Sequence, residues 1–223
     1  MAESTIDLPG LLGARICHDL ISPVGAIGNG MELLALSGDL DGPEKALILE
    51  SSASANARLQ LFRLAFGRSG GGPDPQVSPH EVRTLLGAYS QGHDIEIEWK
   101  IESNLSRLQT KTLLLTVLCL ETVIGRAGRI AVQSDGTNWV VLAIAGRGTQ
   151  VLDLLQLLTA DDPWPAGLTP AQVQFPLARI ALAQSRLAAR LTESTPRIVL
   201  ELANTVRSSG ISPEQSRHLL PDI

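Results

Sequence analysis

The stretch ICHDLISPVGAIGNGMELL, residues 16–34, combines a long apolar repeat with a His-Asp pair, a proline and three glycines. Apolar residues recur in it every three or four positions, which predicts one long helix from residue 11 to about residue 37. The proline should bend this helix, because it lacks the N–H of one backbone hydrogen bond. Six apolar residues fall within an arc of roughly 80° at 100° per residue and should face a neighbouring helix: Ile16, Leu20, Val24, Ile27, Met31 and Leu34.

A second helix is predicted directly after the first. GDLDGP at residues 38–43 is typical of a turn, and Pro43 suits the first position of a helix. From Pro43 to about Phe66, apolar and small residues again recur every three or four positions, as they do in helical bundles. Residues 1–69 should therefore form an antiparallel helical hairpin. Two helices cover only one stripe of each other, so we expect two hairpins to join as a four-helix bundle in a homodimer.

The composition changes at GRSGGGPDPQ, residues 67–76, where three consecutive glycines and two prolines indicate a linker over residues 70–77. Residues 78–223 alternate between helical and strand-like patterns, which predicts helices on one face of a mixed sheet. The predicted fold class is thus α+β, a helical hairpin followed by an α/β sandwich domain. The expected strands are 94–101, a β-hairpin over 129–146, and 196–203. The expected helices are 78–92, 107–126, 149–160 and 171–192.

Composition and charge exclude several classes of function. The 223 residues carry a formal net charge of −5 and contain no block of Lys or Arg, which argues against nucleic acid and anionic membranes as partners. The apolar stretches are too short and too interrupted to span a bilayer. The only cysteines are Cys119 and Cys17, and Cys17 is expected to be a buried thiol at the edge of the helical stripe. With no disulfide framework and no metal-ligand spacing, we expect a cytoplasmic protein without a bound metal.

His18 lies on the opposite side of the predicted first helix from the apolar stripe. An exposed neutral imidazole is a nucleophile near neutral pH. If the Asp19 carboxylate holds one ring nitrogen as N–H, the other nitrogen keeps its lone pair for attack. His18 and Asp19 are therefore the predicted catalytic pair. The residues of this polar face, in order around the helix, are Glu32, Gly25, His18, Asn29, Ser22, Arg15 and Asp19.

Other residues of this face are expected to support the reaction and to admit a partner. Ser22 could orient water or a phosphoryl oxygen, and Arg15 could pair with an anion. Gly25 lies two turns beyond His18 and leaves room for another protein, which would offset the cost of roughly 1 kcal/mol of a glycine inside a helix. The alternative interpretation is a plain surface, with glycines that only let two helices pack. The coincidence of His, Asp, Ser, Pro and Gly in one register favours the functional interpretation.

HDLISP resembles the H-box of two-component histidine kinases, in which His, an acidic residue, two further residues, a small polar residue and Pro follow one another. The longer stretch RICHDLISPVGAI and the AFG at residues 65–67 are similar to the ChpT-type histidine phosphotransferases of alphaproteobacteria. The likeness is strong over residues 11–68 and weaker but colinear afterwards. The residues that match the H-box position by position are His18, Asp19, Ser22 and Pro23.

The resemblance implies a dimerisation and phosphotransfer bundle followed by a degenerate kinase-like ATPase domain. It implies a phosphohistidine at His18 that relays phosphoryl groups between the receiver domain of a hybrid histidine kinase and those of response regulators. The receiver would bring the Mg²⁺. An active histidine autokinase and a non-catalytic dimeric scaffold for response regulators are the alternatives. The residues expected to contact the receiver are Pro23, Gly25, Asn29 and Glu32.

A nucleotide site would need groups that this sequence lacks at the places where the resemblance puts them. A working kinase carries an Asn on the helix that corresponds to residues 113–128, and this segment has none. The adenine-recognising Asp-x-Gly-x-Gly turn would align with IAGRG at 144–148, where Ile144 replaces the Asp. Residues 151–171 contain no glycine-rich phosphate lid. With no carboxylate, amide or glycine cradle for a nucleotide and its metal, we expect no bound ATP and no cofactor.

Overall fold

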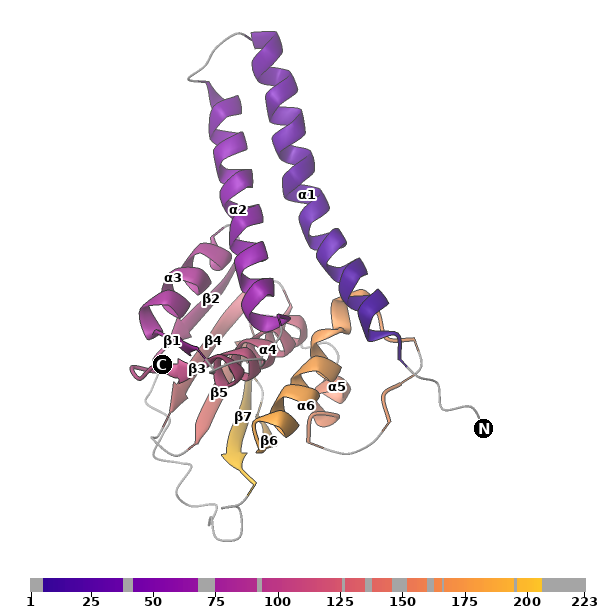
Figure 1. Cartoon of the computed structure of the whole chain (residues 1–223), viewed down its shortest axis with the longest axis vertical. Helices are drawn as coiled ribbons and strands as arrows, with labels where there is room; N and C mark the ends of the chain where they lie inside the picture. Colours follow the sequence, from indigo (N-terminus) through magenta and orange to yellow (C-terminus); the bar gives the residue numbers. More distant parts are fainter. Residues whose placement is uncertain are drawn as a thin grey trace.

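The N-terminal third of the protein is a hairpin of two long helices, α1 (Leu8–Ser37) and α2 (Pro43–Ala65). In the computed structural model they project together from the rest of the molecule (Figure 1). The predicted hairpin is thus confirmed, and its turn at 38–41 lies outside the described residues. The structure describes residues 6–37, 42–67, 75–91, 94–125, 127–134, 138–145, 152–159, 163–165, 167–194 and 196–205.

The glycines of α1 have two different surroundings. Gly30 is buried, and a Cβ placed on it would lie 2.7 Å from Ile48 Cγ1 of α2, so this glycine lets the two helices approach closely. Gly25 and Gly28 have nothing within 4 Å of the same position. Close helix packing therefore explains one of the three glycines and leaves the other two on open surface.

A pair of alanine substitutions tests this difference. Gly30→Ala should lower the free energy of unfolding by about 1–2 kcal/mol, because the new methyl group overpacks against Ile48. Gly25→Ala is the matched control, and it should raise the free energy of unfolding by up to about 1 kcal/mol, because alanine is the better helix former. Denaturant unfolding followed by circular dichroism measures both. Two changes of the same sign would contradict the packing role of Gly30.

The C-terminal domain, here residues 75–205, is a five-stranded mixed sheet covered on one face by helices (Figure 1). Strand order is β2-β4-β5-β7-β6, with β2 and β4 parallel and the other neighbours antiparallel. The strands are β1 (Gln76–Val77), β2 (Asp94–Trp99), β3 (Leu105–Ser106), β4 (Ala127–Ser134), β5 (Trp139–Ala145), β6 (Leu187–Ser194) and β7 (Arg197–Asn204). The helices are α3 (Pro79–Ser90), α4 (Arg107–Ile124), α5 (Leu152–Gln156), the 3-10 helix η1 (Pro170–Gln172) and α6 (Gln174–Gln184).

Helix α4 is the centre of the domain. Leu114, Leu115 and Leu120 are fully buried, because α4 packs against the sheet, α6 and the end of α2. Its N-terminus carries a capping box, in which Ser106 accepts from the Gln109 N–H and the Gln109 side chain accepts from the Ser106 N–H. A helix that is apolar nearly all round is typical of such a buried position.

Two predictions for the C-terminal domain were wrong in detail. The helix expected over 171–192 ends at Gln184, and residues 187–194 form the edge strand β6, which pairs with β7 along its whole length. Tertiary pairing overrides the helix propensity of this Ala-, Leu- and Arg-containing segment. The end of the expected linker, Gln76–Val77, forms strand β1 and pairs with β3. Residues 68–74 lie outside the described part of the chain.

The hairpin is fixed on the C-terminal domain at the end of α2. Two cations of α4 reach carbonyl groups there: Arg107 Nη2 donates to Arg63 O and Lys111 Nζ donates to Gly67 O, both at 2.8 Å. These bonds satisfy carbonyls that a helix C-terminus leaves without partners. At the same base of the hairpin, the N-terminal part of α1 contacts η1. Within the described residues, none of the helices has the length and apolar character that crossing a membrane requires.

Candidate functional site

His18 lies on α1 with its side chain 85% exposed. The residue before it, Cys17, is also exposed in the single chain, so its predicted burial was wrong. The reason is geometric: Cys17 starts a stripe on α1 that α2 does not cover, and this stripe continues through Ile21 and Val24. The imidazole itself is largely exposed, as the predicted polar face requires.

Asp19 holds one nitrogen of the His18 ring. Asp19 Oδ1 lies 3.0 Å from His18 Nδ1, and the Asp19 side chain is only 11% exposed. A carboxylate accepts but does not donate, so this contact favours the tautomer with the proton on Nδ1. Nε2 then carries the lone pair. The two residues predicted to act together are thus in contact.

Arg15 lies behind Asp19 and is not directed at solvent. Its Nε donates to Asp19 Oδ2, and its side chain is 14% exposed. Its Nη1 donates to the Ala171 carbonyl at 3.1 Å and to Gln174 Oε1 at 3.4 Å, both in the C-terminal domain. In this structure the anion that Arg15 pairs with is Asp19, and its predicted contact with an incoming anion stays a prediction.

A groove of about 550 Å³ runs beside His18 between the two helices. Sequence reasoning found the α1 side of this groove and missed the α2 side, although its residues recur there every three or four positions. Gly25, Asn29 and Glu32 are exposed on α1 outside this lining. The groove is lined by His18, Asp19, Ser22, Pro23 and Ala26 of α1 and by Leu47, Glu50, Ser51, Ser54 and Arg58 of α2.

A buried phenol lies near the charged groups of the site. The Tyr89 hydroxyl donates to both carboxylate oxygens of Glu121, each at 2.9 Å. Burial, and after it the Glu121 carboxylate, raises the pKa of Tyr89 well above its ordinary value of 10.0, and the nearby cations Arg15 and Arg58 oppose this shift. Tyr89 of α3 and Glu121 of α4 are thus joined by hydrogen bonds, within electrostatic range of cations on α1 and α2.

The Tyr89 shift predicts how stability depends on alkaline pH. Below pH 10.0 the phenol is protonated in both states; above it, only the unfolded chain loses the proton, so the free energy of unfolding falls as pH rises. Tyr89 is the single tyrosine of the chain, so tyrosinate absorbance reports this group alone. We expect that absorbance to appear together with the loss of helical circular dichroism. Tyrosinate formed near pH 10 in a still folded protein would contradict the buried hydrogen bond.

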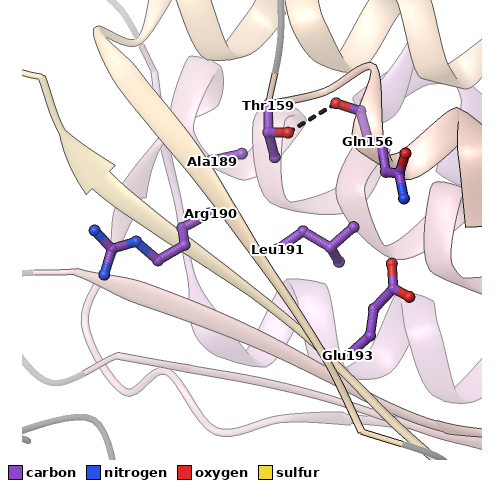
Figure 2. Close-up of a pocket in the computed structure, with 6 residues that line it drawn as sticks. All are labelled: Gln156, Thr159, Ala189, Arg190, Leu191 and Glu193. Carbon is purple, nitrogen blue, oxygen red and sulfur yellow. Dashed lines mark hydrogen bonds between the residues drawn. The ribbon is translucent and has the colours of Figure 1, made fainter. Parts of the chain in front are cut away.

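A second hollow, of about 520 Å³, lies between α5 and the edge strand β6 (Figure 2). In it the Thr159 hydroxyl donates to the Gln156 carbonyl at 2.8 Å, while Arg190 points away from Glu193 (Figure 2). The lining residues all belong to the C-terminal domain: Gln156, Thr159, Ala189, Arg190, Leu191 and Glu193. This hollow is therefore separate from the groove at His18.

The places expected for nucleotide and metal ligands are only partly described. Ile144, which stands where a working kinase carries an Asp, is a half-buried residue of β5, and the glycines after it lie outside the described residues. Among the residues that the structure does describe, no group of three His, Cys, Asp or Glu side chains could hold a metal ion. The expectation of no bound nucleotide stays a prediction.

A helical hairpin that presents an exposed histidine backed by a largely buried aspartate, attached to a mixed-sheet α/β domain, defines a histidine phosphotransfer protein. Residues 79–193 match a family model described as the histidine phosphotransferase C-terminal domain. The chain is 38% identical over 152 residues to the protein phosphotransferase ChpT of Brucella abortus (strain 2308), covering 66% of this chain and 72% of that protein. It also resembles the solved structure of a bacterial phosphotransferase, with a TM-score of 0.69 at 29% identity over 91% of this chain and 98% of that one. The chain belongs to the histidine phosphotransferase family.

Proposed function

We propose that this histidine phosphotransferase works in a phosphorelay and that His18 is its phosphoacceptor. It takes a phosphoryl group from the aspartyl phosphate of one receiver domain and passes it to the aspartate of another. The observation that carries the proposal is the exposed His18 ring, whose Nδ1 is held by Asp19, which leaves Nε2 for the reaction. Receivers of a hybrid histidine kinase and of response regulators are the proposed partners, and the cytoplasm is the proposed place of action.

The transfer balances without an added reactant. The Nε2 lone pair of His18 forms a bond to phosphorus, and the bond from phosphorus to the receiver's carboxylate oxygen breaks. The carboxylate leaves with the electron pair. The imidazole keeps its Nδ1–H and becomes positively charged, and the Asp19 carboxylate stabilises that charge. Transfer to the second receiver is the same step in reverse. Mg²⁺ is proposed to enter with the receiver, and this chain is proposed to bind no cofactor.

The groove at His18 is the proposed docking site for the receiver. Its Ser22, Ser51 and Ser54 hydroxyls can donate to phosphoryl oxygens, and Arg58 adds a positive charge to the same lining. Exposed Gly25 leaves open space along α1 for the approaching backbone. The polar rim of this contact is proposed to include Asn29 and Glu32, with Pro23 at the groove itself.

The proposed assembly is a homodimer through the hairpin. Half or more of the Ile21, Val24 and Met31 side chains is exposed in the single chain, at spacings of three and seven residues along α1. An apolar stripe of this kind calls for a partner helix. At 100° per residue, His18 lies about 100° around α1 from the centre of that stripe. A partner hairpin on the stripe would therefore leave His18 open.

The test is to mix the full-length protein with receiver domains of the same organism that carry label on their aspartates. Transfer of acid-labile label to the protein supports the proposal. Binding to receivers without transfer would overturn it in favour of a scaffold. Labelling by ATP in the absence of a receiver would overturn it in favour of an autokinase.

A further inference from the structure

Gln174, at the start of α6, begins a chain of hydrogen bonds that ends at His18. Gln174 is buried, with only 1% of the residue exposed. Nε2 donates to the hydroxyl of Thr122 on α4 and to the Ala171 carbonyl, 2.8 Å away. Since these two bonds use both amide hydrogens, they fix the orientation of the amide, and Oε1 accepts from Arg15 of α1 at 3.4 Å.

Arg15 connects this buried amide to the candidate site. Its Nη1 is held by two acceptors of the C-terminal domain, and its Nε donates to Asp19 Oδ2. A guanidinium is planar and rigid, so fixing one edge also fixes the edge that faces Asp19. The other Asp19 oxygen lies 3.0 Å from His18 Nδ1. Every step from Thr122 to the imidazole is thus a direct contact.

The burial of the Gln174 amide indicates that its hydrogen bonds to Thr122 and Arg15 do more than fill space. A buried amide costs free energy unless its hydrogen bonds are made, and an apolar side chain of similar volume would fill the same space without that demand. Here the amide is satisfied, and one of its partners comes from the hairpin. The contact between η1 and α1 places this link at the joint between the two parts of the protein (Figure 1).

We propose that Gln174 is a positioning residue that, through Arg15, sets the tautomer and ring orientation of His18. The proposal rests on the proposed phosphotransfer at His18, and it gives the C-terminal domain a part in that reaction. With Gln174 present, Arg15 holds Asp19 so that one carboxylate oxygen stays on Nδ1. Without it, Arg15 loses an anchor, Asp19 can rotate, and both tautomers of His18 become populated.

The test uses Gln174→Leu and Arg15→Met in the full-length protein. The ring ¹⁵N chemical shifts of His18 give the fraction of each tautomer, and a receiver domain phosphorylated with acetyl phosphate gives the rate of label transfer. We expect mainly the Nδ1–H tautomer in the wild type and a mixture in both variants. We expect the transfer rate to fall about tenfold, as it does when a partner that orients a metal-bound histidine is removed.

Thr112→Val is the matched control. It removes a hydroxyl of α4 that lies 2.8 Å from Ser185 Oγ, so it changes a buried polar group of the same domain outside the Gln174 link. Its tautomer ratio and transfer rate should equal those of the wild type. A wild-type tautomer ratio in folded Gln174→Leu, or in Arg15→Met, would overturn the proposal, and Arg15→Met still tests the link if Gln174→Leu does not fold. A wild type that accepts no label would refute phosphotransfer, and the tautomer measurement would still decide the role of Gln174.

Discussion

His18→Ala should accept no acid-labile label from a phosphorylated receiver under conditions that label the wild type to completion. The expected loss is on the order of 10³-fold or more, the usual result of removing the only nucleophile of a reaction. The side chain is 85% exposed, so its removal leaves no cavity, and the free energy of unfolding should change by less than about 0.5 kcal/mol. The measurement is the initial rate of label transfer, with circular dichroism to verify the fold.

His80→Ala is the matched control for this variant. His80 is an exposed histidine on α3, and the same substitution there should leave the rate unchanged. Label on His18→Ala at the wild-type rate would move the phosphoacceptor to another residue and refute the proposed mechanism. Loss of label in both variants would show a general effect of removing surface histidines.

The hairpin could be predicted because its signals are local. Helical period, the proline at the start of the second helix and the turn between the helices are all contained in short windows of sequence. Strand β6 could not be predicted in this way, because its sequence, LAARLTES, has no strand signal of its own. Its conformation is decided by pairing with β7, where Arg190 lies opposite Glu201.

The site divides in the same manner. His18 and Asp19 are adjacent in sequence and lie on one helix, so helix geometry alone predicts that they can interact. The partners of Arg15 are Ala171 and Gln174, more than 150 residues away along the chain. Nothing local indicates that Arg15 would support Asp19 from behind, since that role depends on where the C-terminal domain meets α1. The α2 side of the groove is easier to predict than the partners of Arg15, because it follows from packing the two predicted helices side by side.

The double variant Val24→Lys and Met31→Lys should be monomeric at concentrations where the wild type is dimeric. Val24 is 57% and Met31 53% exposed in the single chain, so pairing of two hairpins would bury the half of each residue that is now exposed. Losing that burial costs about 1 kcal/mol per side chain, and a symmetric dimer contains four of them. The sum of about 4 kcal/mol corresponds to a rise of about 10³-fold in the dimer Kd, before any cost of burying lysine is added.

Sedimentation velocity over a dilution series measures this change, and Ile180→Lys is its control. Ile180 is 44% exposed on α6, outside the hairpin, so a lysine there adds a charge without touching the proposed interface. Lysine is a good helix former, so the double variant should keep its hairpin and its helical content. A dimer that survives the double substitution would place the interface elsewhere and leave the apolar stripe of α1 without its proposed partner. A monomer that still accepts label at His18 would show that one hairpin on its own C-terminal domain forms the complete phosphotransfer site.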